Sequence, residues 1–410
     1  MSSGSIPLDD SRRAGVEPAP ERDVRTDEMI VSMGPQHPST HGLLRVVLRI
    51  DGELVVEAMP QIGYLHRCVE KIGERVSARQ FVPYTDRLDY LAAMNMNLGW
   101  SLAVEKLLGV EVSGRARHLR VLMCELNRIA SHLVAACSAG LDVGSFTPFM
   151  WCFRERERIL DLFEEVCGAR LTYSYIVPGG VMADLPEGWP RRCLSVLDGL
   201  EPVIGELHAA LTSNAIFIGR MAGVGVLPAA TAIAYGCSGP VLRGSGVAWD
   251  LRRDGEPIYA RMYDGYRFEV VAQVGGRYPN RPGDPQPPRE AVLGDCWHRF
   301  YVRMLEVVES IGLVRQAIEF HARAAEPLGP PLPIRQKLPR GEAYLETEAP
   351  KGQMGFMIVG DGSPVPYRVR VRSSSFSHTA VMPELCRGCL LADLTAIIGS
   401  LDIVLGEIDR

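Results

Sequence analysis

The chain has 410 residues, which is enough for two or three packed units with a large buried core. Hydrophobic residues make up 47% of the sequence and charged residues 23%, and this balance excludes wholesale disorder. With 49 acidic and 44 basic side chains the net charge is −5, so no overall positive field attracts nucleic acid.

The N-terminal segment is expected to be a flexible arm over residues 1–28. It carries mixed charges and prolines and lacks the apolar core of a secretory signal. The most apolar stretch, residues 221–237, is too short to span a bilayer and contains four Gly or Pro. The ten cysteines do not follow the spacing of a disulfide framework, which is typical of a reducing compartment. The sequence therefore predicts a soluble, cytoplasmic chain.

Three short motifs resemble ligand sites, and each is incomplete. The single CxxC motif, at 386–389, supplies two of the four ligands that a metal or cluster normally needs. The GVG string at 223–225 begins a dinucleotide fingerprint, but Pro228 stands where the third glycine belongs. His37 and His41 have the spacing of a zinc helix without the glutamate of HExxH, so we expect them on a loop.

A β hairpin is predicted after the arm. Alternating apolar residues at 43–50 and 53–59 flank the Asp-Gly pair at 51–52, the strongest two-residue turn signal. This hairpin defines an N-terminal β domain over 29–62, with His41 at its entrance.

Two helices are predicted next. An amphipathic pattern indicates a short helix over 64–75. A longer helix is expected from a cap at Thr85 or Asp86 to the residue before Gly109, which places Tyr90 in its first turns.

A third helix is expected from Arg115 to about Cys137. Its polar side chains are interpreted as internal ion pairs rather than catalysts: His118, Glu125, Arg128 and His132. The loop at 141–144 then presents Asp142 among glycines and apolar neighbours, so this carboxylate is predicted to be buried.

The remaining chain predicts further helices at 153–167 and 296–325, with a Gly/Pro-rich loop at 275–290. Near the C-terminus an Asp-Gly hairpin signal at 361–362 accompanies three alternating strands: 343–347, 354–359 and 367–372. The fold class is therefore α+β. A long-helix bundle over 63–335 lies between the N-terminal β domain and a C-terminal β region with a final helix or tail over 336–410.

Seven strings in one order make the sequence similar to a known family: GPQHPSTHG (34–42), IGYLHR (62–67), RLDYL (87–91), FRERE (153–157), GPVLR (239–243), PYR (366–368) and SLDIVLGEIDR (400–410). Together they resemble the family of 49-kDa-type D subunits of NADH-quinone oxidoreductase, respiratory complex I. The resemblance covers residue 28 to the end. It implies a quinone-binding subunit of an oxidoreductase complex that is active only when assembled.

The same family is related to the large subunits of [NiFe] hydrogenases, which implies a hydrogenase-like fold and supplies an alternative enzyme. Those proteins hold their metals with two CxxC pairs. The register places Asp89 and Ala92 at the first pair, and Val404 and Glu407 at the second. Because none of these residues is a thiolate, we expect no bound metal and no hydrogenase chemistry.

By the resemblance, Tyr90 and His41 match ligands of the quinone headgroup, and Asp142 matches the carboxylate that pairs with the histidine. Arg67 has a weaker claim as a positive group near the cavity, and a salt bridge at a helix end is an equal reading. A tyrosine and a histidine suit this chemistry, because reduction of a quinone to a quinol needs hydrogen-bond donors at the carbonyls and a supply of protons.

The resemblance also implies the partners. Electrons are expected from the iron-sulfur cluster of the neighbouring B subunit, with FMN and further clusters in other subunits and no metal, flavin or NAD in this chain. The C subunit and the membrane arm are expected contacts, which implies a peripheral protein on the cytoplasmic side of the cell membrane. A structural scaffold that never touches quinone is the second function class. The choice between ubiquinone and menaquinone, and between NADH and another donor, stays open.

Several residues depart from the family pattern. Cys68 stands where a glycine is usual, Gln353 replaces an acidic residue, Ser374 replaces a proline, and the 275–290 loop is longer than typical. These departures affect expected partner contacts rather than the quinone ligands.

Overall fold

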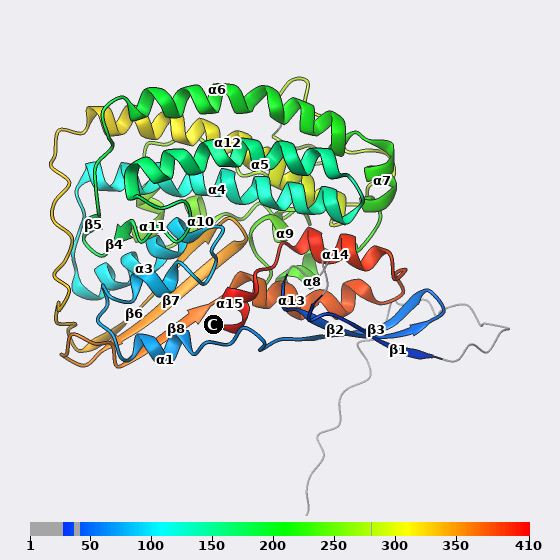
Figure 1. Ribbon diagram of the computed structural model, residues 1–410, viewed down its shortest axis with the longest axis horizontal. Helices are drawn as coiled ribbons and strands as arrows, with labels where there is room; N and C mark the ends of the chain where they lie inside the picture. Colours follow the sequence, from blue (N-terminus) through cyan, green and yellow to red (C-terminus); the bar gives the residue numbers. More distant parts are fainter. Residues whose placement is uncertain (1–27, 37–41, 280) are drawn as a thin grey trace, which may run out of the picture.

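The computed structural model describes residues 28–36, 42–279 and 281–410. Four long helices lie side by side along its longest axis (Figure 1): α4 (Gly114–Asp142), α5 (Phe146–Cys167), α6 (Trp189–Leu207) and α12 (Cys296–Arg323). Helix α4 contacts both α5 and α12, so it forms the centre of this bundle. Its apolar residues recur every three or four positions and are fully buried: Leu119, Leu122, Leu126, Ile129 and Leu133.

The N-terminal sheet has the predicted hairpin. Strands β1 (Met29–Met33), β2 (Arg45–Asp51) and β3 (Leu54–Gln61) are antiparallel in the order β1-β2-β3. Gly52 has φ of +60° in the turn between β2 and β3, a conformation that favours glycine. The side chains of Val46 and Leu48 are fully buried on one face of the sheet.

The three predicted C-terminal strands are confirmed as an antiparallel sheet of β6 (Gly341–Ala349), β7 (Gly352–Gly360) and β8 (Arg368–Arg372). The Asp-Gly pair at 361–362 begins a longer connection from β7 to β8, not a two-residue turn. The tight turn joins β6 to β7 at residues 350–351, which the sequence patterns do not indicate.

The helix predicted over 64–75 is wrong in its first half. Helix α1 covers only Val69–Gly73, because Cys68 has φ of +59° and interrupts a helical path. The amides of Gly63 and Leu65 instead donate to the carboxylate of Asp409, at 2.8 and 2.6 Å. These long-range hydrogen bonds hold the segment in an irregular form that helical periodicity does not predict.

The helix predicted from Thr85 is also broken. The chain forms α2 (Val82–Thr85), a turn at 86–92, and then α3 (Ala93–Leu108), which ends as expected at Gly109. The carboxylate of Asp86 accepts hydrogen bonds from the amide and hydroxyl of Ser174, at 3.0 and 2.6 Å. The Asp86 side chain is thus engaged by a distant segment and does not cap a helix.

Helix α4 is longer than predicted and ends at Asp142, so this residue belongs to the last helical turn rather than to a loop. Helix α5 begins at Phe146, seven positions before the predicted start, and Pro148 fits its first turn, where the missing amide costs no helical hydrogen bond. The helix predicted at 296–325 is confirmed as α12.

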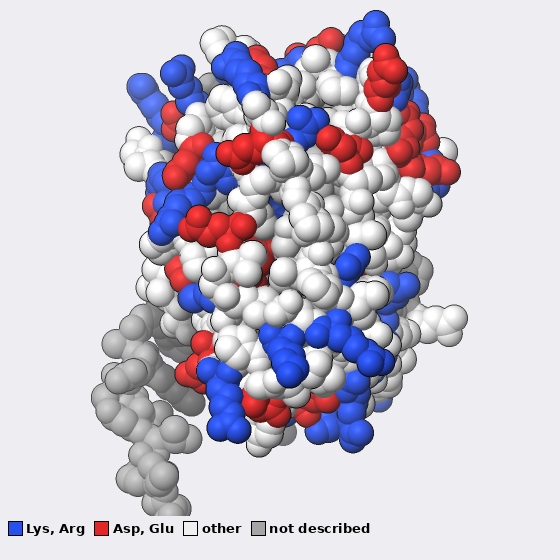
Figure 2. Space-filling model, turned by 90° about the vertical axis from the view of Figure 1, so that its left-hand side faces the viewer, with Lys and Arg blue, Asp and Glu red and all other residues white. Residues whose placement is uncertain are grey.

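Shorter elements complete the described chain: β4 (Ile176–Val177), β5 (Gly180–Val181), α7 (Ala215–Met221), α8 (Ala229–Ala234), α9 (Gly239–Arg243), α10 (Leu251–Asp254), α11 (Pro257–Ala260), α13 (Ser374–Cys386), α14 (Asp393–Leu401) and α15 (Leu405–Asp409). Among the described helices, none is long and apolar enough to cross a membrane. Acidic and basic side chains are interspersed on the face shown in Figure 2, so neither sign dominates that surface.

Candidate functional site

Tyr90 lies in the turn between α2 and α3, and its exposed fraction is 38%. Asp89 shapes this turn, because its carboxylate accepts a hydrogen bond from the amide of Leu91 at 3.1 Å. Burial, followed by the negative charge of Asp89, raises the pKa of the Tyr90 phenol. Tyr90 is therefore a neutral hydrogen-bond donor at physiological pH, with part of its ring open to a ligand.

Arg67 supports the same turn. Its guanidinium donates to the carbonyl oxygen of Arg87 at 2.8 Å, three residues before Tyr90. The side chain is exposed, and no salt bridge of Arg67 is found among the described residues. The alternative of a salt bridge at a helix end is therefore replaced by a backbone hydrogen bond that braces the segment carrying Tyr90.

A buried acid–lysine cluster lies next to Tyr90. The Lys351 ammonium lies 3.3 Å from a carboxylate oxygen of Asp402 and 3.8 Å from one of Asp89. Burial lowers the pKa of Lys351, but Asp402 and Asp89 together raise it further, so the lysine is charged. Burial raises the pKa of Asp89 to about 6 in spite of the opposing lysine. Asp89 therefore changes its protonation state close to neutral pH.

Glu407 brings a third carboxylate to the cluster. One oxygen accepts hydrogen bonds from the Ser375 amide at 2.8 Å and the Ser374 hydroxyl at 3.1 Å, and the other lacks a hydrogen-bond partner among the described residues. Its charge also raises the pKa of Asp89. The structure thus brings together segments that are more than 300 residues apart in the chain, and the sequence patterns do not group these residues.

Asp142 is half-buried at the C-terminal end of α4, so the prediction of a fully buried carboxylate is wrong. The end of the helix is near the surface, which leaves one side of the residue open. His41, its predicted partner, lies outside the described residues. The pairing of these two side chains therefore stays a prediction.

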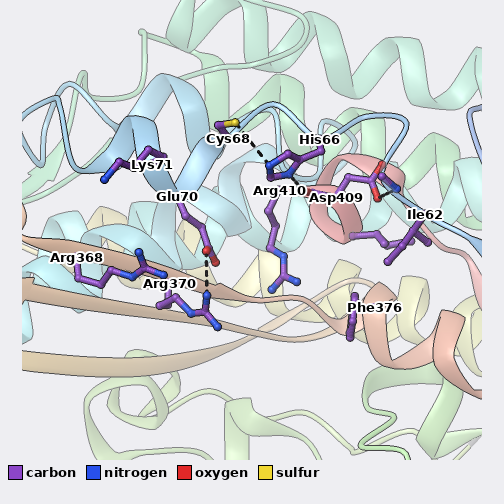
Figure 3. Close-up of a pocket in the computed structure, with 12 residues that line it drawn as sticks. Ile62, His66, Cys68, Glu70, Lys71, Arg368, Arg370, Phe376, Asp409 and Arg410 are labelled. Atoms are coloured by element: carbon purple, nitrogen blue, oxygen red, sulfur yellow. Dashed lines mark hydrogen bonds and ion pairs between the residues drawn. The ribbon is translucent and has the colours of Figure 1, made fainter.

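A cavity of about 370 Å³ lies between α1, β8 and α15 (Figure 3). Its lining is rich in charge: His66, Glu70, Lys71, Arg368, Arg370, Asp409 and Arg410. The His66 Nδ1–H donates to the carbonyl oxygen of Asp409 at 2.6 Å, and this leaves Nε2 to face the Cys68 sulfur at 3.6 Å. Tyr90, Asp142 and Arg67 do not line this cavity, so it is separate from the predicted quinone ligands.

A second network of buried charges crosses the helix bundle. The Glu306 carboxylate lies 2.7 Å from Arg243 and 2.9 Å from His132, and Arg243 also reaches Glu348 at 2.7 Å. Burial opposes ionisation of Glu306, but Arg243 and His132 outweigh it and hold the pKa of this carboxyl at about 2. The prediction of internal ion pairs is confirmed for His132, whose partner is Glu306.

Two more polar residues of α4 test the same prediction. Glu125 pairs with Arg128 at 3.2 Å in the bundle interior, as expected. His118 instead lies 2.8 Å from the Tyr266 hydroxyl, so its contact is a hydrogen bond rather than an ion pair.

Comparison with known proteins assigns the family. A family model described as the 49 kDa subunit of respiratory-chain NADH dehydrogenase matches residues 142–328 and 334–410. The D subunit of the NADH-quinone oxidoreductase of Chlorobium luteolum is 47% identical over 398 residues, which cover 95% of each chain. The second of the numbered D subunits of the Sorangium cellulosum enzyme is 47% identical over 97% of this chain and 98% of its own. The chain therefore belongs to the family of the 49 kDa subunit of respiratory-chain NADH dehydrogenase.

Proposed function

We propose that this chain forms the quinone-reducing site of a proton-translocating NADH:quinone oxidoreductase, together with a cluster-bearing neighbour. The single observation that carries the proposal is Tyr90, a neutral phenol that is partly exposed, braced by its turn and adjacent to a buried group that titrates near neutral pH. The relatives named above are quinone oxidoreductase subunits, which supports the same assignment.

In this proposal, the Tyr90 hydroxyl donates a hydrogen bond to one carbonyl of the quinone, and His41 donates to the other. Asp142 pairs with His41, favours its imidazolium form and positions the ring. Arg67 acts indirectly, by holding the carbonyl of Arg87 and hence the turn that presents Tyr90.

Protons and electrons reach the quinone from different sources. Reduction to the quinol consumes two electrons and two protons. We assign the electrons to an iron-sulfur cluster in the B subunit, fed through FMN and other clusters in partner subunits. The protonated carboxyl of Asp89 is a proton store beside Tyr90, because its pKa of about 6 allows it to release and regain a proton near neutral pH.

The same proposal includes the hydrogenase-like ancestry of the fold. The positions registered with the two metal-binding thiol pairs include Asp89 and Glu407, whose carboxylates interact in the buried cluster. Within the described residues, no group of three or more His, Cys, Asp or Glu side chains is arranged to hold a metal ion. Lys351 lies against Asp89, where its positive charge offsets carboxylates that replace thiolates.

We further propose that the chain contacts the B and C subunits and the membrane arm, as a peripheral subunit on the cytoplasmic side. The direct test is photolabelling of the intact complex with a quinone that carries a photoreactive headgroup. Labelled peptides are expected to contain Tyr90 or the 34–42 segment, and an excess of unlabelled quinone should remove the label. Labelling confined to other subunits would favour the structural scaffold instead.

A further inference from the structure

The CxxC motif forms a tight turn at the end of α13. Cys386 is the last residue of the helix, Arg387 has φ of −66° and ψ of 122°, and Gly388 has φ of +77°. The amide of Cys389 donates to the carbonyl oxygen of Cys386 at 3.3 Å. These features are those of a type II β-turn with a cysteine at each corner, and the positive φ at its third position favours glycine.

This turn places the two cysteines within the range of a disulfide bond. The corner Cα atoms of a β-turn are less than about 7 Å apart, and disulfides join Cα atoms at about 4.4–6.8 Å. The Cys386 thiol also donates a hydrogen bond to the sulfur of Cys389, so the side chains face each other. Closure therefore requires only a small movement of the two side chains.

The turn is fixed by the N-terminal sheet. Strand β3 holds it from both sides, since the Gly388 amide donates to the Val55 carbonyl at 2.7 Å and the Val55 amide donates to the Cys389 carbonyl at 2.9 Å. The Leu391 amide extends this pairing by donating to Glu53 at 2.8 Å. The corner positions are thus pre-organised by backbone hydrogen bonds that do not involve the sulfur atoms.

The two thiols differ in access and acidity. Cys386 is fully buried, whereas Cys389 is half-buried and lines a cavity of about 400 Å³ beside residues 223–226. The hydrogen bond from Cys386 lowers the pKa of the Cys389 thiol, although burial opposes this effect. Burial raises the pKa of several other thiols and keeps them protonated: Cys124, Cys137, Cys152, Cys193 and Cys237.

We propose that Cys386 and Cys389 are a redox-active dithiol that closes to an intrachain disulfide on reaction with a low-molecular-weight disulfide such as oxidised glutathione. The Cys389 thiolate attacks one sulfur of the oxidant, forms a mixed disulfide and releases one glutathione thiolate. Cys386 then loses its proton to that thiolate, attacks the Cys389 sulfur and releases the second glutathione. The chain loses two electrons, and the oxidant gains them as two thiols. This inference is independent of the proposed quinone chemistry.

The test uses the full-length chain equilibrated anaerobically in glutathione buffers that range from fully reduced to fully oxidised. Free thiols are then alkylated, and the peptides are analysed by mass spectrometry. The oxidised chain should yield a peptide that contains both cysteines, unalkylated and lighter by two hydrogens than the reduced form, and dithiothreitol should restore both alkylation sites.

Two variants and one native residue provide controls. Cys386→Ser leaves Cys389 without its partner, so oxidation should stop at the mixed disulfide with glutathione. Cys389→Ser leaves a buried thiol that should remain unmodified. Cys68, which is exposed, should form only a mixed disulfide. Alkylation of both Cys386 and Cys389 in the wild-type chain at every buffer ratio, or a persistent mixed disulfide on Cys389, would overturn the proposal.

Discussion

Glu306 is the buried carboxylate on which the helix-bundle charge network converges. It bonds to Arg243 and His132, and all three side chains are almost completely excluded from water. Its pKa of about 2 lies below the ordinary value of 4.5, so the native state holds this proton less tightly than the unfolded chain does. The stabilisation is therefore present above about pH 4.5 and is lost as the pH falls toward 2.

Replacing Glu306 by glutamine should remove most of this stabilisation. The change leaves Arg243 facing one fewer carboxylate in the interior, and loss of one partner of a buried pair costs about 3–5 kcal/mol. Urea unfolding at pH 7 should show this decrease in the free energy of unfolding. Glu319→Gln on the same helix is the matched control, because its exposed pair with Arg323 is worth less than about 1 kcal/mol. Equal losses in the two variants would contradict the account.

Asp142 yields a prediction about the pH dependence of turnover. Asp142→Asn removes the charge proposed to favour the His41 imidazolium, so the pKa of that imidazole should fall and the pH profile of quinone reduction should shift toward lower pH. Reduction of the clusters by NADH should be unchanged. Asp161→Asn, on the exposed face of α5, serves as the control. Full turnover with an unaltered profile in Asp142→Asn would show that this carboxylate is not the partner of His41.

At this scale, local sequence patterns identify polar residues of α4 but not their partners. The pairing of His132 with Glu306 joins two helices that are distant in the chain, and no spacing rule connects them. The patterns do not single out Lys351 either, since a single lysine after a strand usually faces water. The signal that could have marked it is its place in a two-residue turn between two strongly apolar strands.

Among the elements, helix α3 shows how close packing depends on one residue. A Cβ atom on Gly99 would lie 2.8 Å from the ring of Phe356 and 3.1 Å from the Thr347 hydroxyl oxygen, so the helix approaches β6 and β7 closely because residue 99 is glycine. Trp100, next in the sequence, packs edge-on against the same ring with centroids 6.1 Å apart. This contact joins the helical part of the chain to the C-terminal sheet.

Gly99→Ala should destabilise the chain by about 1–3 kcal/mol, because the new methyl group overpacks this contact. Gly205→Ala, in an exposed position of α6 with open space around it, should instead stabilise by about 0.4–1 kcal/mol through a higher helix propensity. Thermal or urea unfolding of both variants provides the comparison. The same sign for the two changes would contradict the described packing of α3.

Long periodic elements are predictable from the sequence, and irregular ones are not. The hairpin of β2 and β3, helix α12 and the three C-terminal strands follow from periodicity and turn residues. The turn at 86–92 does not, because it is set by Asp86 bonding to Ser174 across the fold. This turn places Tyr90 between two helices instead of within one, and it gives the ring its exposed edge.

For the whole molecule, the segments closest to the proposed site come from both ends of the chain. The Asp409 carboxylate fixes Gly63 and Leu65, and Lys351 bridges Asp89 and Asp402. These contacts bring the C-terminal tail against the segment between β3 and α3. The division into an arm, two β regions and a helical core at residues 28, 62 and 335 stays a prediction, since many contacts cross those limits.

Quinone kinetics of Tyr90→Phe in the intact complex test the central claim most directly. The change removes only the hydroxyl, and loss of one donor to developing charge in a water-excluded site costs about 100- to 1,000-fold. Quinone turnover should fall strongly or the apparent KM should rise, while NADH oxidation with a hydrophilic artificial acceptor remains normal. Tyr235→Phe is the matched control, because Tyr235 has the same exposed fraction of 38%. Wild-type quinone kinetics in an intact Tyr90→Phe complex would contradict the account and assign this chain a structural role.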